Sequence, residues 1–364
     1  MLWLRKIVFY IFALIYLVIC PLIVARMLGF VINPLTHHIV KTGLVYISTN
    51  PPDATVYVDG RLSHQKTPAV LRDLRPGKHF IRIEMDGYND WERDVPIVGK
   101  KATVLANTLL IPQEWPIKKI SDRSYQNIFP AGQDILIATD PILKDIDIYH
   151  SSQGPGKSLF SKNSIYADGL LVRLFSAPKS PFILLEATIK DKHKFLWVNL
   201  KENPPMVEDI SDLFSDIPTR IAWDNADNEN IFAFYLRDVY RINIKDKAVS
   251  LQDAGRLPEG LGTQASDALS DKFLINDKNT LLVREGIQIR IYPKEDFGPS
   301  KVYDIARSKP LTNMYFEEKT GELFYLDDDT GFLYTAQILP YHPILNIPIP
   351  ESLRIDIPKK ESAI

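Results

Sequence analysis

Residues 43–60 read Gly-Leu-Val-Tyr-Ile-Ser-Thr-Asn-Pro-Pro-Asp-Ala-Thr-Val-Tyr-Val-Asp-Gly and predict two short β-strands separated by a tight turn. The first strand, Leu44–Ser48, is a run of β-branched and aromatic residues. It ends at two prolines, which lack the N–H group that a β-ladder needs. Thr55–Val58 is the second strand, and Asp59-Gly60 closes it because glycine accepts a positive φ angle. This part of the chain is therefore expected to be built of β-strands.

The alternation of short strands and turns continues to about residue 112. In the segment 80–84, Ile81 and Ile83 fall on one face and charged residues fall on the other, as in a strand with one buried face. Further strands are expected at 91–95 and 103–110, and further turns at 75–77 and 86–88. Residues 43–112 therefore predict a small β-sandwich of about six or seven strands.

The same residues resemble the PEGA domain, whose pattern has a Pro-x-x-Ala turn, a strand ending in Asp-Gly, Thr-Pro, a Leu-x-x-Gly-x-His stretch and Gly-Tyr. The matching elements are Pro51-Pro52-Asp53-Ala54, Val58-Asp59-Gly60, Thr67-Pro68, Leu74-Arg75-Pro76-Gly77-Lys78-His79 and Gly87-Tyr88. The chain departs from the naming motif, because Pro52 and Asp53 replace its Glu and Gly. The resemblance covers a fifth of the chain. It implies a module of a cell-envelope protein, similar to surface-layer modules, and brings no catalytic residues with it.

Two aromatic residues of this unit, Tyr88 and Trp91, have two interpretations. They could form a surface on which a ligand stacks, because aromatic rings present large flat faces. They could instead pack in the core and the hairpins of the sandwich, and this is the favoured interpretation.

An almost uninterrupted apolar run, Ile7–Ala25, precedes the β-rich part of the chain. At about 1.5 Å per residue, a helix of this length spans about 28 Å, close to the hydrocarbon thickness of a bilayer. Pro21 lies near its end, where a membrane helix tolerates a kink, and Arg26 can reach the headgroups. Residues 1–32 therefore predict a transmembrane anchor with a short cytoplasmic N-terminus, followed by a linker over 33–42.

Three other interpretations of the apolar run are open. A cleaved signal peptide would use Ile23-Val24-Ala25 as a poor cleavage site, but the run exceeds a usual signal core of about 7–15 residues. A lipoprotein signal would need a small residue before Cys20, where the chain has Ile19. A buried helix of a globular protein would show a polar face, which this run lacks. The anchor is favoured over all three.

Basic residues flank the run unevenly. Arg5 and Lys6 crowd its N-terminal side, whereas Arg26 and Lys41 are spread over the other side. The positive-inside rule then favours a cytoplasmic N-terminus and an exported body. We therefore expect a single-pass protein of the cytoplasmic membrane with an extracytoplasmic body.

The composition is that of a folded protein without a strong charge bias. The 364 residues are 45% hydrophobic and 24% charged, and the formal net charge is −2. This balance provides no basic field for nucleic acid, so no nucleic-acid partner is expected. The one cysteine, Cys20, lies in the apolar run, so the body has no disulfide and no thiol chemistry.

Apolar strands recur beyond residue 113 at intervals of about 42–50 residues, the spacing of propeller blades. They lie at Ile135–Ala138, Phe182–Leu185, Ile231–Phe234, Leu281–Val283 and Leu323–Tyr325. Second strands, aromatic or β-branched, follow at Ile146–Tyr149, Phe195–Val198, Val239–Ile242, Ile287–Tyr292 and Leu333–Ile338. About five blades are therefore expected over 113–340. A sixth could be hidden in Pro116–Phe129 or around Asp253–Phe273.

One copy of the repeat, Arg220–Phe234, resembles the WD40-like, TolB-type propeller repeat of envelope proteins, in which a Trp-x-Pro-Asp-Gly turn joins two strands. Trp223 and Asn230–Phe234 fit this pattern, although the turn Asp224–Asn228 lacks the proline and the glycine. The resemblance implies a β-propeller with degenerate repeats.

A second copy, Asn313–Tyr325, places Phe316 near the position that Trp223 has in the first copy. Trp223, Phe232 and Phe316 are expected to be core residues at blade interfaces rather than ligand contacts. Two shorter pieces complete the chain. Glu208–Phe214 could form a short amphipathic helix, and the Pro-rich tail 341–364 could be an extended arm or a strand that closes the last blade.

Several motifs resemble chemical sites but lack essential parts. Gly156-Lys157-Ser158 resembles the end of a phosphate-binding loop, but the glycine needed five residues earlier is Ser151. Asp327–Gly331 resembles part of a calcium loop but lies between two predicted strands, so a hairpin turn is favoured. The seven histidines form no metal-binding pair, and no Gly-x-Ser-x-Gly elbow occurs. We therefore assign no catalytic, cofactor-binding or metal-binding residue and expect no cofactor.

The sequence thus predicts a mostly β protein with one transmembrane helix, a PEGA-like sandwich and a propeller-like domain. The favoured function is that of a non-enzymatic, bacterial cell-envelope protein that acts as a scaffold or uses its propeller to bind a protein or a glycan, by analogy of fold. The alternative is a hydrolase or lyase acting on envelope polysaccharide, which would need two carboxylates about 5–10 Å apart in a concave pocket. A third is a module that only binds the cell wall.

Overall fold

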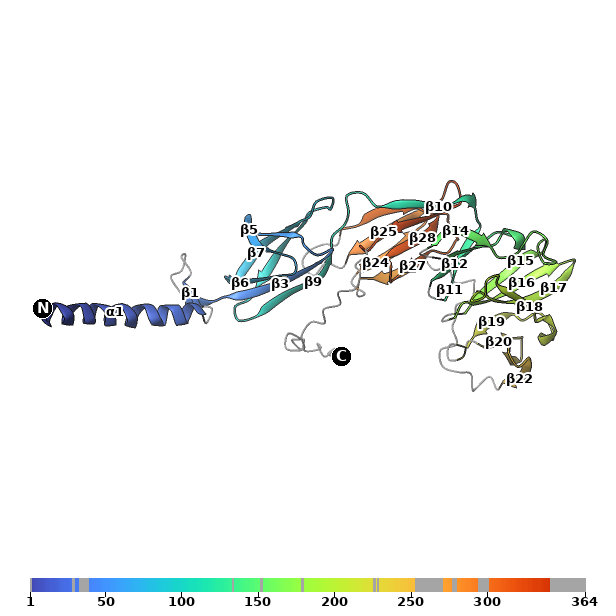
Figure 1. The fold of residues 1–364 in the computed structure, drawn as a ribbon, viewed down its shortest axis with the longest axis horizontal. Coiled ribbons are helices and arrows are strands. Elements are labelled where there is room, and N and C mark those ends of the chain that lie inside the picture. Colours follow the sequence, from blue (N-terminus) through green and yellow to red (C-terminus); the bar gives the residue numbers. More distant parts are fainter. Residues whose placement is uncertain are drawn as a thin grey trace.

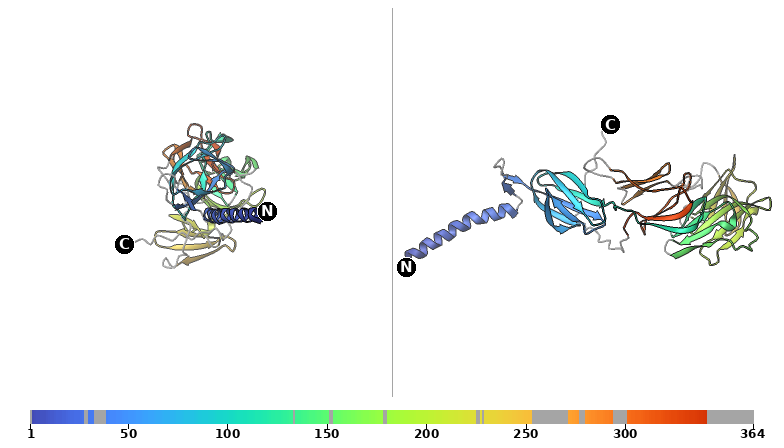
Figure 2. Two further views of the ribbon diagram at one scale, coloured as in Figure 1. Left: turned by 90° about the vertical axis from the view of Figure 1, so that its left-hand side faces the viewer. Right: turned by 90° about the horizontal axis from the view of Figure 1, so that it is seen from above.

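The computed structural model is elongated, with a helix at one end, a β-sandwich next to it and five further β-sheets beyond (Figure 1 and Figure 2). The structure describes residues 2–27, 30–32, 39–132, 134–150, 153–177, 180–224, 227, 229–252, 271–276, 280–293 and 301–340. The last sheets of the chain fold back toward the sandwich, so sheets from the middle of the chain lie farthest from the helix (Figure 1).

The N-terminal helix α1 spans Leu2–Met27 and contains Pro21. Its apolar side chains lie open: Phe12, Tyr16 and Leu17 are 72%, 70% and 71% exposed. The stretch Val8–Ala25 is long and apolar enough to cross a membrane and has no residue buried against the rest of the described chain. A helix that is apolar on all sides is typical of a membrane span or a buried core, and the structure excludes burial in this protein's core.

A two-stranded antiparallel sheet follows the helix and corrects the predicted linker. It pairs β1 (Phe30–Ile32) with β2 (Ile39–Lys41), and the Nζ of Lys41 lies 4.6 Å from the centroid of the Phe30 ring. The predicted boundary between anchor and linker, at residues 32 and 33, therefore falls inside a hairpin. The three-residue segments 30–32 and 39–41 pair as strands because both are rich in β-branched residues. Residues 33–38 lie outside the described residues.

Seven strands form the predicted sandwich, in sheets of order β6-β3-β9 and β5-β4-β7-β8. The strands β3 and β9 run parallel, and the other neighbours are antiparallel. Their bounds are β3 Gly43–Asn50, β4 Thr55–Val58, β5 Arg61–Lys66, β6 Ala69–Leu74, β7 Gly77–Glu84, β8 Trp91–Ile97 and β9 Ala102–Leu109.

The sandwich core is filled by alternate residues of the strands, as the sequence predicts. Ile81 and Ile83, which the pattern placed on one face, are both fully buried together with Ile47 of β3. The turn after β4 has positive φ angles of 49° at Asp59 and 77° at Gly60, which glycine adopts without strain. The alternation of buried residues and the turn at Asp59-Gly60 are therefore both as the sequence predicts.

Five four-stranded sheets follow, and each is named a blade in chain order: first β11–β14, second β15–β18, third β19–β22, fourth β23–β26, and fifth β27–β29 with β10. The bounds of the first two are β11 Asn127–Ala131, β12 Ile135–Thr139, β13 Asp147–His150, β14 Gln153–Ser158, β15 Leu170–Ser176, β16 Phe182–Ile189, β17 Lys192–Asn199 and β18 Met206–Asp209. Those of the next two are β19 Arg220–Trp223, β20 Asn230–Phe234, β21 Val239–Asn243, β22 Ala248–Gln252, β23 Lys272–Ile275, β24 Thr280–Glu285, β25 Gln288–Pro293 and β26 Tyr303–Arg307.

The fifth blade joins the two ends of the propeller-like chain. Its own strands are β27 (Tyr315–Glu317), β28 (Glu322–Leu326) and β29 (Phe332–Gln337), and β10 (Ile117–Ser124) completes it by pairing with β29. The segment Pro116–Phe129 therefore supplies a closing strand and not a sixth blade. Because β10 pairs with the edge of β29, it closes the last blade, a role that the sequence also allows for the tail 341–364. Residues 253–270 and 341–364, where the other blade and the tail were expected, lie outside the described residues.

Apolar clusters join neighbouring blades face to face. One cluster is shared by the fourth and fifth blades and contains Leu282 and Leu323, and another is shared by the fifth and first blades and contains Phe324 and Leu136. A third joins the first and second blades through Ile137 and Leu185, and a fourth joins the second and third blades through Leu184 and Trp223. The strands predicted from the repeat are the second and third strands of every blade, which confirms the propeller-like repeat. Each blade is thus stabilised by burial against its neighbours.

The prediction of an amphipathic helix over Glu208–Phe214 is wrong. Glu208 and Asp209 end β18, the outer strand of the second blade, and only Ser211–Leu213 forms a single 3-10 turn. The carboxylate Oδ1 of Asp209 accepts a hydrogen bond from the backbone N of Ser211 at 3.0 Å. This side-chain bond to the backbone favours a turn over a continuous helix.

Candidate functional site

Side-chain hydrogen bonds join the sandwich to the fourth blade. The Nδ2 of Asn276 donates to the carbonyl O of Asn107 at 2.8 Å, and the Nδ2 of Asn50 donates to the Oδ1 of Asn276 at 3.4 Å. The indole Nε1 of Trp115 donates to the carbonyl O of Asp304 at 3.0 Å. These bonds connect residues far apart in sequence, so they orient one lobe on the other.

Apolar packing reinforces the same joint. Leu109 and Ile111, at the end of the sandwich, are 5% and 4% exposed and belong to one cluster with Ile275, Leu282 and Ile289 of the fourth blade. Because the two lobes share this buried cluster, the joint is part of the folded core rather than a flexible linker.

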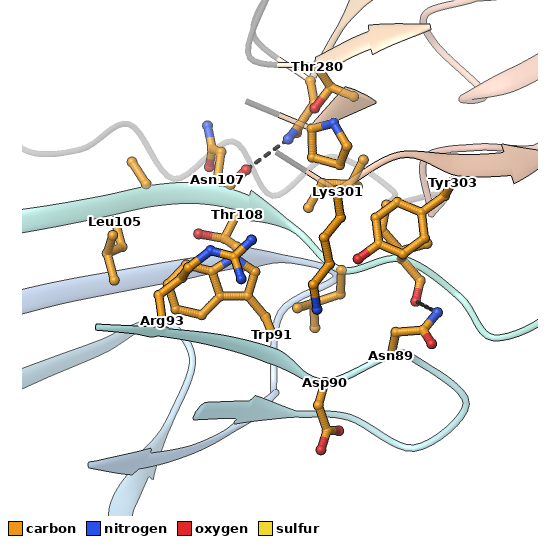
Figure 3. A pocket seen from close by; sticks show the side chains of 16 residues that line it. Asn89, Asp90, Trp91, Arg93, Leu105, Asn107, Thr108, Thr280, Lys301 and Tyr303 are labelled. Carbon is orange, nitrogen blue, oxygen red and sulfur yellow. Dashed lines mark hydrogen bonds between the residues drawn. The ribbon is translucent and has the colours of Figure 1, made fainter. Parts of the chain in front are cut away.

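A cavity of about 50 Å³ lies beside the joint (Figure 3). Trp91 and Arg93 come from β8, Lys301 precedes the fourth blade's last strand, and Tyr303 is the first residue of that strand. Burial raises the pKa of Tyr303, and the charge of Arg93 opposes this rise. Small-molecule pockets measure about 300–1,000 Å³, so this cavity has room for water but not for a sugar or a cofactor.

A larger cleft, of about 340 Å³, lies between the second and third blades. One wall is a face of the second blade, on which Trp197 of β17 stands opposite Glu208 of β18. Asn199 is paired with Phe182 on one side and with Met206 on the other. Residues two apart in a strand share a face, so these five side chains line the cleft together.

The other wall comes from the third blade and consists of Glu229, Ile244 and Lys245. The backbone N of Ile244 donates to the carbonyl O of Glu229 at 2.9 Å, which holds the two segments together. Glu229 directly precedes β20, and Ile244 directly follows β21. The cleft is therefore framed by strand ends on one side and by a flat strand face on the other.

The cleft combines an aromatic and thioether surface with polar side chains. The ring centroids of Phe182 and Trp197 lie 5.3 Å apart at an interplanar angle of 49°, and Met206 is 39% exposed. The indole Nε1 of Trp197 is buried and meets no hydrogen-bond partner among the described residues. Tryptophan and methionine are enriched at binding interfaces, because they bury large apolar areas and adapt to a partner.

Both carboxylates of the cleft bind lysines. Glu208 is 2.6 Å from the Nζ of Lys247, and Glu229 is 3.7 Å from the Nζ of Lys245. The cleft thus has two acids in its lining, the residue type on which the hydrolase or lyase alternative depends. Each acid is thus paired with a lysine, an arrangement that suits polar recognition of a ligand.

The segment Gly156–Ser158, which resembles the end of a phosphate-binding loop, lies in a strand. These residues belong to β14, in which Lys157 pairs with Ile148 of β13. A phosphate loop instead leads into a helix whose backbone N–H groups cradle the phosphate.

The acidic segment Asp327–Gly331 is a hairpin turn between β28 and β29, as predicted. The Oδ2 of Asp327 accepts hydrogen bonds from the backbone N of Thr330 at 3.0 Å and from its Oγ1 at 2.7 Å. Asp328 binds the guanidinium of Arg307 at 2.7 Å. Within the part of the chain that the structure describes, no group of three or more His, Cys, Asp or Glu side chains is arranged to hold a metal.

The aromatic residues predicted to be buried are buried. Trp223, Phe232 and Phe316 are 2%, 1% and 7% exposed. Tyr88 and Trp91 pack against the sandwich core, which supports the packing interpretation, although Trp91 also lines the joint cavity. The residues that line the cleft were not singled out in the sequence, because their common face depends on which strands pair.

Comparison with known families identifies a family model that matches the sandwich. Residues 42–111 match the model of the PEGA domain, as their turn motifs predict. Similar solved structures include the β-propeller domain of Cps50 (Swd1) from Myceliophteria thermophila, with a TM-score of 0.30, 8% identity, and coverage of 71% of this chain and 93% of that chain. Another is the AfRom2 CNH domain, with a TM-score of 0.22, 10% identity, and coverage of 68% and 70%.

A third similar structure is a functionally unknown protein from Desulfotomaculum acetoxidans DSM 771, with a TM-score of 0.26, 10% identity, and coverage of 72% and 90%. A comparison with the sequences of curated proteins finds no match. The arrangement of the blades is defined by the strand order and the closing pair of β10 with β29.

Proposed function

We propose that this protein is a membrane-tethered, non-enzymatic binding or scaffold protein of the bacterial cell envelope. In this proposal α1 crosses the cytoplasmic membrane with its N-terminus in the cytoplasm, as the flanking basic residues favour. The body then lies outside the cytoplasm, and the cleft between the second and third blades binds an envelope protein or a glycan.

One observation carries the proposal: α1 lies at one end of an elongated molecule, and the second and third blades lie at the other (Figure 1). The helix exposes its apolar side chains, and these two blades line the aromatic cleft. A tether at one end and a recognition surface at the other suit a protein that holds a partner at a distance from the bilayer. The joined lobes support the same role, because a shared core keeps that distance fixed.

Site-directed photo-crosslinking in cells tests the binding site. A photoreactive residue at Met206, in the cleft, is expected to give a defined adduct that mass spectrometry identifies as one envelope component. The matched control is the same residue at Phe80, an aromatic position of the sandwich that is 43% exposed. Identical adduct patterns at the two positions would contradict the assignment of the cleft.

The alternative as a polysaccharide hydrolase or lyase is favoured only by the two acids of the cleft, Glu208 and Glu229. The full chain and its Glu208→Gln and Glu229→Gln variants, incubated with envelope polysaccharide, distinguish the two functions. The binding function predicts no cleavage products from any of them. Products that vanish in both variants would establish the enzyme instead.

A further inference from the structure

The end of the sandwich nearest the helix is formed by three turns and the strand ends that flank them, residues 59–61, 74–78 and 98–101. These three segments are here named the helix-side loops. They lie there because β3 starts next to the helix and leads away from it, and the following strands alternate in direction. We infer that the helix-side loops form a basic surface that binds the anionic headgroups of the membrane in which α1 is anchored.

Backbone contacts hold these loops beside the incoming chain. The N of Lys100 donates to the carbonyl O of Thr42 at 3.0 Å, and the N of Leu44 donates to the carbonyl O of Lys101 at 3.3 Å. A Cβ at Gly99 would contact the carbonyl O of Lys41, so the glycine permits this close approach. The loop 98–101 is therefore fixed directly next to the segment that leads from the helix.

The other two loops are joined to each other. The Nδ1 of His79 is 2.7 Å from the Oδ2 of Asp59, and its Nε2 is 2.8 Å from the carbonyl O of Arg75. The backbone N of Phe80 donates to the Oδ1 of Asp59 at 3.0 Å. Asp59 thus joins two of the loops through His79 and Phe80, and with its side chain 51% exposed it is the one acidic group of this surface.

The charges of the sandwich are divided between its two ends. The helix-side loops contain five basic residues, Arg61, Arg75, Lys78, Lys100 and Lys101, and one acidic residue, Asp59. The loops at the opposite end, 50–54, 66–68, 85–90 and 110–115, contain one basic residue, Lys66, and four acidic residues, Asp53, Asp86, Asp90 and Glu114. The basic end therefore faces the helix, and the acidic end faces the blades.

The basic side chains are free to meet a surface. All five are exposed, and none forms an ion pair with another described residue. Val98, which is 52% exposed, stands among them at the tip of its loop. Several basic residues close to a bilayer bind anionic lipid, and each contributes about fivefold to the equilibrium between the surface-bound and the free state.

This inference rests on the proposed insertion of α1, and its test uses the full chain in vesicles. A fluorophore is attached at Val98→Cys in a Cys20→Ser background, and lipids with a quencher on the headgroup are included. In vesicles of phosphatidylcholine mixed with phosphatidylglycerol, we expect stronger quenching than in phosphatidylcholine alone. High salt should remove the difference, because the Debye length falls from about 10 Å at 0.1 M to about 3 Å at 1 M.

The variant Lys100→Gln/Lys101→Gln separates charge binding from tethering. Neutralising both lysines is expected to lower the ratio of surface-bound to free sandwich by about 25-fold, and thus to weaken the phosphatidylglycerol effect. The matched control is Lys190→Gln/Lys192→Gln, at a turn of the second blade far from the helix, which should leave the quenching unchanged.

Retention of the protein in vesicles after carbonate extraction is measured in the same samples. If the chain stays inserted but quenching is equal with and without phosphatidylglycerol, or is the same in the lysine variant, the inference is overturned while the proposed anchor stands. If the chain is extracted by carbonate, the anchor itself fails, and the inference fails with it.

Discussion

The sandwich and the blades are both built of short, mostly antiparallel strands, but different interactions decide their order. In the sandwich, tight turns such as Asp59-Gly60 connect strands that enclose one core cluster. The first four blades are simple meanders, and the arrangement of all five comes from clusters shared between sheets and from the pairing of β10 with β29. The comparison teaches that local turns can fix a small lobe, whereas the larger lobe depends on contacts between distant segments.

The largest effect is expected from removing a core residue shared by two blades. Trp223 is 2% exposed and packs between the second and third blades. Trp223→Ala should destabilise the blades by about 3–5 kcal/mol, because it leaves a large cavity. Hydrogen exchange read by mass spectrometry should show lost protection in these blades, with the sandwich unchanged.

The control for this change is Leu236→Ala, in the turn of the same blade, where the side chain is 94% exposed. It should alter stability by less than about 0.5 kcal/mol. Equal loss of protection in the sandwich and the blades after Trp223→Ala would show that the two lobes unfold as one unit, against the comparison drawn above.

A smaller effect is expected at the closing strand. Gly331 and Gly286 both lie in hairpin turns with positive φ angles, of 68° and 66°, but only at Gly331 would a Cβ meet a neighbour, the Oγ of Ser124 in β10. Gly286→Ala should cost about 1 kcal/mol for backbone strain alone. Gly331→Ala should cost about 2–3 kcal/mol, because strain and displacement of β10 add.

Chemical denaturation of the two glycine variants measures this difference. If Gly331→Ala and Gly286→Ala proved equally stable, the Cβ at position 331 would be accommodated without disturbing β10, and the expected difference would be wrong.

The joint between the lobes should respond more weakly still. Asn276→Ala removes the bond to the carbonyl O of Asn107 and should cost about 1 kcal/mol. The matched control is Asn243→Ala, which removes a bond to Asn230 within the third blade. Small-angle scattering should show a wider spread of lobe orientations only for Asn276→Ala, and an unchanged profile would assign the joint to the apolar cluster alone.

The smallest effect concerns the surface pair of Lys194 and Asp209, 2.8 Å apart. Burial acts to raise the pKa of Asp209, but hydrogen bonds from Lys194 and Ser211 outweigh it, so the pKa is lowered. A carboxyl group with a lower pKa in the folded state stabilises the fold at pH values above its pKa in the unfolded state, about 3.9. This stabilisation is lost as the pH falls through the pKa of the folded state. Lys194→Met should reduce that acid-dependent loss, by less than about 1 kcal/mol for an ion pair open to solvent.

Unfolding measured between neutral and acidic pH checks this sign. Lys192→Met, at the exposed start of the same strand, serves as the control and should follow the unmodified protein. An acid-dependent loss that is larger in Lys194→Met than in the unmodified protein would contradict the assigned direction.

Much of this fold follows from local sequence. The second strand of each blade is predicted because it is a run of apolar residues, and the third because it is aromatic or β-branched. The strand β3 is predicted from its β-branched and aromatic residues, and β7 because apolar residues alternate with charged ones. By contrast, β5 is almost fully exposed and shows no alternation, so its pattern does not reveal a strand. The hairpin of β1 and β2 is missed because three-residue strands are too short to show a period.

The closing strand and the cleft depend on contacts that no local pattern records. Ile117–Ser124 is a polar segment whose partner lies beyond residue 330, so only the folded chain shows that it ends a blade. Trp197 and Glu208 come together because β17 and β18 pair in one register, and a shift of one residue would turn them to opposite faces. Sequence therefore indicated the kind of lobe but not the place of its recognition surface.

The central claim is that α1 holds the sandwich near a membrane and the second and third blades far from it. Energy transfer to an acceptor dye on lipid headgroups measures this directly in vesicles that contain the full chain. Donor dyes are placed at Leu62→Cys in the sandwich and Leu236→Cys in the third blade, both exposed positions, in a Cys20→Ser background. The account predicts strong transfer from position 62 and weak transfer from position 236; transfer from 236 that equals or exceeds that from 62 would contradict it.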